Sequence, residues 1–137
     1  MGNKIEFQVP GLPVALKRPR MTKRGIVYDP SKKEKQIFSI RCNKYKPPKP
    51  WKGPIEITIN FLFKRPVSHI KKNGELRKNA PEQHIYKPDI DNLVKFVLDS
   101  LSGTFFDDDK QVVIMHTTKA YDFYEDLTLI KINKLIL

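Results

Sequence analysis

Carboxylates gather in one short stretch of an otherwise cationic chain. Residues 89–109 hold six acids and one base, Lys95, which gives a net charge of −5, whereas residues 1–88 hold 21 bases and six acids, a net of +15. Carboxylate oxygens are preferred ligands of Mg²⁺ or Mn²⁺, and a cationic surface attracts a polyanion. This charge layout is typical of a metal-dependent nuclease. The six acids are Asp89, Asp91, Asp99, Asp107, Asp108 and Asp109.

The first pair of carboxylates lies at the expected start of a helix. Pro88 suits the approach to a helix, and Asp89 and Asp91 follow it. One aspartate at such a position is commonly a cap that accepts hydrogen bonds from free backbone N–H groups. Capping does not require two aspartates, nor does it explain Lys95, four residues after Asp91 on the same helix face. Taken alone, that spacing is best interpreted as an ordinary Asp91–Lys95 ion pair.

Three consecutive aspartates, residues 107–109, lie between this expected helix and an expected strand. Like charges repel, and a solvated surface turn would tolerate them. A helix–turn–strand connection could instead fold the triplet back towards Asp89 and Asp91, so that three or four carboxylates converge on a divalent metal. The spacing does not match a calcium-binding EF-hand loop.

The overall composition favours nucleic acid as the partner. The 137 residues carry a formal net charge of +11, with a pI of about 9.8. The single cysteine, Cys42, excludes an internal disulfide and indicates a reducing compartment, and three scattered histidines suggest no zinc site. No apolar run approaches the length of a membrane span, and the N-terminus lacks a signal-peptide pattern, so we expect a cytoplasmic protein without a membrane partner.

Apolar periodicity predicts the strands that must position these groups. The expected strands cover residues 5–9, 55–63, 112–121 and 127–137. The order of elements lacks the long crossover pattern of a doubly wound sheet. We therefore expect one α+β domain over residues 1–137, with a mixed, largely antiparallel sheet packed against two main helices.

Two segments have the pattern of helices. Ser31 is a candidate N-cap for a basic helix that reaches about Tyr45, and its thin apolar stripe leaves one face for solvent or DNA. The second helix begins in the Asp89–Asp91 stretch, runs to about Ser102 with a continuous apolar face, and ends at Gly103.

Two polar segments are expected to be irregular. Residues 65–86 are lysine-rich and have the composition of a mobile loop. An earlier, proline-containing segment is strongly basic, and we interpret it as a loop that contacts phosphate rather than as a solvated charge run. Its bases are Lys17, Arg18, Arg20, Lys23 and Arg24.

Two motifs carry a family resemblance. Residues 89–95 read DIDNLVK and residues 108–112 read DDKQV, while residues 10–30 form a proline- and arginine-rich opening. These resemble the D-x-D-N-L-x-K helix start, the D-D-x-Q-V strand entry and the opening segment of the RusA-type Holliday junction resolvases of bacteria and phages. Together the motifs are highly specific, although residues 46–86 and the last fifteen add little.

The resemblance implies a homodimer that binds a four-way DNA junction and nicks two strands of like polarity symmetrically during recombination or repair. It implies Mg²⁺ as cofactor, with Mn²⁺ as a substitute. The family's catalytic aspartates correspond to Asp89, Asp91 and Asp109, which would hold the metal, and its essential lysine to Lys95. That lysine would stabilise charge on the phosphorane or the leaving 3′ oxygen, orient the water, or hold a carboxylate in place.

Three further residues are placed by the resemblance or by their position. Asp107 lies outside the family's pattern, so the match is anchored on the following Gln-Val pair, with Asp108 as the alternative metal ligand to Asp109. Lys87 stands where many members carry a base beside the site, and it is expected to touch phosphate. Asn92 either supports the metal ligands by hydrogen bonding or is an ordinary residue of the first helical turn.

Two other functions remain compatible with these residues. A flap or single-strand endonuclease could use the same catalytic groups, and relative cleavage of junctions, flaps and duplexes would separate it. A non-catalytic DNA-binding protein of recombination could retain the acidic cluster, and it would show no metal-dependent nicking. The intact set of three aspartates and a lysine argues against this second alternative.

Overall fold

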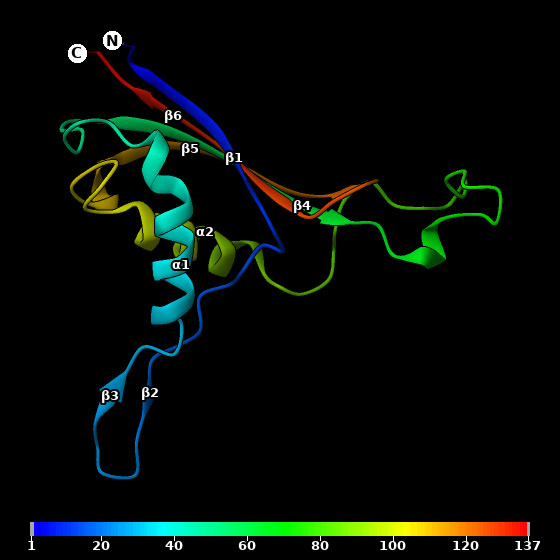
Figure 1. Ribbon diagram of the computed structural model, residues 1–137, viewed down its shortest axis with the longest axis horizontal. Helices are drawn as coiled ribbons and strands as arrows, with labels where there is room; N and C mark the ends of the chain where they lie inside the picture. Colours follow the sequence, from blue (N-terminus) through cyan, green and yellow to red (C-terminus); the bar gives the residue numbers. More distant parts are fainter. Residues whose placement is uncertain (1, 137) are drawn as a thin grey trace.

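The computed structural model describes residues 2–136, and in it two helices cover one face of a four-stranded sheet (Figure 1). The elements in chain order are β1 (Lys4–Pro10), β2 (Arg20–Met21), β3 (Val27–Tyr28), α1 (Lys32–Cys42), η1 (Asn43–Tyr45), β4 (Ile55–Lys64), η2 (Val67–His69), α2 (Ile90–Leu101), η3 (Asp109–Gln111), β5 (Val112–Asp122) and β6 (Leu127–Lys134). Within residues 2–136 no helix is long and apolar enough to cross a lipid bilayer.

The main sheet has the strand order β1-β6-β4-β5. Strand β6 pairs antiparallel with β1 on one side and with β4 on the other, whereas β4 and β5 are parallel. The predicted α+β class, with a mixed and largely antiparallel sheet, is confirmed. The parallel pair needs a crossover connection, and α2 lies within it, so the structure contains one βαβ unit that the sequence analysis did not anticipate.

The core lies between the sheet and the two helices. Because side chains alternate along a strand, Ile55, Ile57 and Ile59 of β4 all face the helices and are fully buried. From the other side, α2 contributes an apolar face that includes Leu93 and Val97. Burial of each such side chain contributes roughly 1.5–3 kcal/mol, so the strongest patterns in the sequence are also the main source of stability.

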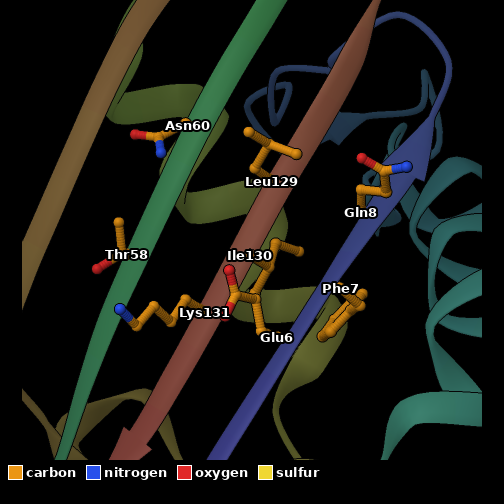
Figure 2. A pocket seen from close by; sticks show the side chains of 8 residues that line it. All are labelled: Glu6, Phe7, Gln8, Thr58, Asn60, Leu129, Ile130 and Lys131. Atoms are coloured by element: carbon orange, nitrogen blue, oxygen red, sulfur yellow. The ribbon is translucent and has the colours of Figure 1, made fainter.

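The opposite face of the sheet is open and polar. Figure 2 shows Glu6 and Gln8 on β1, Thr58 and Asn60 on β4, and Lys131 on β6 around a hollow of about 430 Å³, with the helices behind the sheet. This hollow holds one carboxylate and lies across the sheet from α2. It is therefore separate from the acidic stretch.

The ends of α1 and α2 differ in how far they follow the prediction. Ser31 occupies the N-cap position of α1, but its hydroxyl does not cap the helix. Instead, Ser31 Oγ accepts a hydrogen bond from Lys17 N (2.9 Å), so the buried hydroxyl ties the preceding segment to α1. Helix α2 ends at Leu101, and Gly103 follows with a φ of 88°, a left-handed conformation that favours glycine and terminates the helix as predicted.

Both polar segments contain more structure than the sequence analysis expected. The basic segment forms the β2–β3 hairpin, which projects away from the body (Figure 1). Residues 65–86 also project and include η2 and a bridge between Ile70 and Leu76. The expectation of irregular loops is therefore wrong for parts of both segments, because local backbone hydrogen bonds organise chains that lack apolar periodicity.

Candidate active site

Asp89 and Asp91 lie at the start of α2 with exposed side chains. Asp89 occupies the N-cap position in extended backbone conformation, yet its carboxylate makes no capping hydrogen bond. The capping interpretation is thus wrong for the Asp89 side chain, which leaves its oxygens available to a ligand. The positive end of the helix macrodipole also favours negative charge at this position.

An exposed charged stripe runs along α2. Asp91, Lys95 and Asp99 follow one another at intervals of four residues, so they share one face while the apolar residues between them are buried. Among residues 2–136, Lys95 makes no ion pair, so the simple Asp91–Lys95 pair is not formed. The Lys95 ammonium is therefore directed at solvent rather than used in stabilising the fold.

The three consecutive aspartates have different partners. Asp107 forms an ion pair with Lys52 (2.8 Å). Asp108 caps η3, because its Oδ1 accepts from Lys110 N (2.9 Å) while its own N–H donates to Gln111 Oε1 (2.9 Å). Asp109 has neither role, and this difference supports its assignment over Asp108 as the metal ligand.

Asp108 and Asp109 interact strongly with each other. A hydrogen bond from the Lys110 N–H, followed by one with Asp109, lowers the pKa of Asp108. The hydrogen bond with Asp108, partial burial and the charges of Asp108 and Asp99 raise the pKa of Asp109. Two carboxyl groups that share a proton in this way form an oxygen-rich position at which a divalent cation can replace the proton.

The carboxylates do not converge within one chain. Between residues 2 and 136, no three acidic, histidine or cysteine side chains lie close enough to hold one metal ion, so the expected convergence is wrong. The reason is the length of α2. Asp89 and Asp91 lie at its first turn and Asp109 follows its last, and a helix of 12 residues is roughly 18 Å long.

Lys119 is a site residue that the sequence analysis missed. Its Nζ donates hydrogen bonds to the carbonyl oxygens of Tyr86 and Pro88 (2.7 Å for Pro88), the residues on either side of Lys87. The backbone before Asp89 is therefore held against β5. One signal was available, because Lys119 pairs with Phe61 and so occupies a core-facing position of β5, where a lysine needs polar partners.

The start of α2 also contacts the stem of the basic hairpin. Leu16 N donates to Asn92 O (2.9 Å), and Ala15 and Asn92 line a hollow of about 450 Å³ together with residues 87–89. Lys87 is exposed beside this hollow, as its expected phosphate contact requires. Asn92 has only its backbone carbonyl in a hydrogen bond within the described chain, so its supporting role stays a prediction.

The basic hairpin presents most of its cations to solvent. Lys17 is the exception, since its Nζ pairs with Glu34 of α1 (3.4 Å). The other four bases make no ion pair with any residue between 2 and 136. These four are Arg18, Arg20, Lys23 and Arg24. Lys35 of α1 anchors the far end of the hairpin by pairing with Asp29 (2.6 Å).

Comparison with known proteins matches most of the chain. The family model described as endodeoxyribonuclease RusA matches residues 10–133. Among curated proteins, the uncharacterized protein YqaN of Bacillus subtilis (strain 168) is 36% identical over 124 residues, which cover 85% of this chain and 87% of YqaN. Both motif segments, residues 89–95 and 108–112, lie inside the matched range of the family.

Proposed function

Because the chain belongs to the endodeoxyribonuclease RusA family, we propose that it resolves four-way DNA junctions by paired, symmetric nicks, with Mg²⁺ as its cofactor. The observation that carries the proposal is the start of α2, where the carboxylates of Asp89 and Asp91 are exposed and Asp89 does not cap the helix. The partner is branched DNA, and the reaction takes place in the cytoplasm, where that DNA is found.

Asp89, Asp91 and Asp109 are the proposed metal ligands. A Mg²⁺ ion keeps several waters and binds one or two carboxylates together with substrate phosphates, so a cage of protein oxygens is not needed. When bound, the metal would polarise a phosphate oxygen and lower the pKa of a water. The residues' own contribution is a set of hard oxygen donors at a helix start that Lys119 holds in place.

Lys95 is the proposed electrostatic catalyst. It lies one turn after Asp91 on the exposed face of α2, and no described carboxylate neutralises it. An ammonium group in this position would stabilise the negative charge that develops on the phosphorus oxygens or on the leaving 3′ oxygen. Lys87 and the hairpin bases would hold the flanking phosphates.

We propose further that two copies complete each site. One chain cannot bring Asp109 to Asp91, because α2 separates them, whereas Asp109 of a second copy is free of that constraint. Strand β5 follows Asp109 at the edge of the sheet, and three consecutive apolar residues there are exposed. These are Val113, Ile114 and Met115. A two-fold dimer also matches the symmetry of a four-way junction.

Cleavage of a synthetic mobile four-way junction, with and without Mg²⁺, tests the proposal. We expect paired nicks that require the metal, with much slower cleavage of a flap, a single strand and a linear duplex of the same sequence. Preferred cleavage of the flap or single strand would contradict junction resolution. Metal-dependent nicking that is absent from all four substrates would contradict nuclease activity altogether.

A further inference from the structure

Residues 65–86, here called the lysine arm, form a second cationic projection. The arm leaves the end of β4 and extends away from the sheet (Figure 1). It carries five bases and two acids, a net charge of +3. The bases are Arg65, Lys71, Lys72, Arg77 and Lys78. In the sequence this segment has the composition of a loop, and nothing in the proposed mechanism uses it.

The root of the lysine arm is built from aromatic and arginine contacts. Arg65 Nη1 donates to Pro81 O (2.6 Å), and its guanidinium lies over the ring of Tyr121, 5.3 Å from the centroid. His84 stacks on Phe63 with ring centroids 4.1 Å apart. The two ends of the arm are therefore tied to each other and to the edge of the sheet.

The outer part of the lysine arm is also organised. Arg77 N donates to His69 O (2.9 Å), and Arg77 Nε donates to Ser68 O (3.1 Å). Lys71 N donates to Glu75 O (2.7 Å) across a turn at Gly74. Both arginines are thus used within the arm, whereas the three lysines are exposed and make no ion pair among residues 2–136.

The two cationic projections begin on opposite sides of the catalytic segment. The lysine arm ends at Tyr86, which Lys119 holds next to Asp89. The stem of the basic hairpin, residues 17–28, meets the same segment through the Leu16–Asn92 hydrogen bond. Figure 1 shows that the hairpin and the arm then extend in different directions from the body.

We propose that the lysine arm binds the phosphate backbone of one duplex branch while the basic hairpin binds a different branch. The inference rests on the proposed function and adds a second binding surface to it. Exposed lysines without ion-pair partners release counterions from DNA when they bind it. A linear duplex follows one direction, whereas a four-way junction sends branches in several directions from the cleaved phosphate. Diverging cationic projections rooted at one catalytic segment fit the branched geometry.

Charge-neutral variants of the full-length protein separate these contributions. The arm variant is Lys71→Gln, Lys72→Gln and Lys78→Gln, and the hairpin variant is Arg20→Gln, Lys23→Gln and Arg24→Gln. A matched control removes the same charge from exposed lysines of the loop after α1, on another part of the molecule (Figure 1). The control is Lys44→Gln, Lys46→Gln and Lys49→Gln. Thermal unfolding checks that all three remain folded.

Binding is measured without divalent metal, to a four-way junction and to a linear duplex of equal length, over a range of salt. We expect the arm variant to bind the junction about tenfold more weakly and to lower the salt slope by about 0.9 for each lost phosphate contact. The control should change both quantities much less. Combining the arm and hairpin changes should give additive losses of free energy on the junction, and less than additive losses on the duplex.

Three outcomes would overturn the inference. An arm variant that binds the junction like the control would mean that the lysines only solvate the arm. Equal, non-additive losses on junction and duplex would mean that both projections contact the same branch. In either case wild-type cleavage of the junction would leave the proposed function standing. Wild-type protein that binds no junction would contradict the proposed function, and this inference with it.

Discussion

At the scale of single residues, neighbouring aspartates have different uses because their partners differ. Asp107 neutralises Lys52 and Asp108 caps η3, whereas Asp109 shares a proton with Asp108 and has no partner of opposite charge in the described chain. The same contrast holds at α2, where an aspartate at the N-cap position leaves its carboxylate free. Residues whose oxygens are not occupied by the fold are the ones expected to act on substrate.

The change Asp91→Asn should reduce nicking by at least about 100-fold, which corresponds to about 3 kcal/mol in the activation barrier. Junction binding should stay the same or become tighter, because the change removes negative charge beside a polyanion. Single-turnover cleavage and binding titrations measure the two effects. The control is Asp107→Asn, which removes only a surface ion pair worth about 0–1 kcal/mol. A near wild-type rate for Asp91→Asn would show that Asp91 is not a metal ligand.

The change Lys95→Ala should lower the cleavage rate about 100-fold or more, while affinity and thermal stability change little. A charge that acts in the transition state contributes roughly 3 kcal/mol, whereas an exposed helix ion pair contributes about 0.5 kcal/mol to stability and nothing to rate. Single-turnover rates and melting temperatures distinguish these cases. Full activity with reduced thermal stability would mean that Lys95 has only a structural role.

The change Lys119→Met should raise the Mg²⁺ concentration needed for half-maximal cleavage by about 10–100-fold. Groups that orient metal ligands typically affect metal affinity to this extent, and Lys119 fixes the backbone next to Asp89. Cleavage rates measured against Mg²⁺ concentration test this, and Lys119→Arg should recover much of the affinity. Lys131→Met, on the open face, is the control. An unchanged metal requirement would exclude a positioning role.

At the scale of elements, the basic hairpin should supply phosphate contacts one residue at a time. Replacing Arg18, Arg20, Lys23 or Arg24 with Ala should weaken junction binding by small, similar steps and reduce the salt slope by about 0.9 each. Lys17→Ala should have a smaller effect on the slope, because Lys17 also pairs with Glu34. Cleavage at saturating protein should remain nearly normal. Affinities and slopes that do not change in any variant would mean that the hairpin does not bind DNA.

Elements with strong apolar periodicity were predictable, and those organised by individual hydrogen bonds were not. The alternation of β4 and the apolar face of α2 follow directly from burial, and both were predicted close to their observed bounds. Ser31 has the residue type of a cap, but its hydroxyl is claimed by Lys17 N, a residue 14 positions away. Such a competition between partners depends on the fold and leaves no local pattern.

The candidate site was predictable as a set of residues but not as an arrangement. The two motifs identify the acidic residues and Lys95, yet they do not state which end of α2 each group occupies. Once α2 is formed, its length keeps Asp91 apart from Asp109. Lys119 was missed because, among 26 bases, a core-facing position in a strand distinguishes it only when the pairing with β4 is known.

At the scale of the whole molecule, a site shared between two copies can be tested by mixing inactive variants. Asp91→Asn and Asp109→Asn proteins should each be inactive, but a mixed dimer would contain one site with all its ligands. Mixing and exchange should therefore restore single nicks in the junction. Mixing Asp89→Asn with Asp91→Asn damages both sites and should restore nothing. Equal results for the two mixtures would contradict a shared site.

The pairing of β1 with β6 has a consequence for how the protein is made. Residue 4 pairs with residue 133, and β6 separates β1 from β4 in the sheet. A ribosome that adds about 5–20 residues per second therefore produces β1 roughly 6–25 s before its partner. During this time Phe7 and Val9, which are buried in the finished sheet, have no neighbouring strand. The nascent chain depends on chaperones or on its own dilution until nearly all of it has been translated.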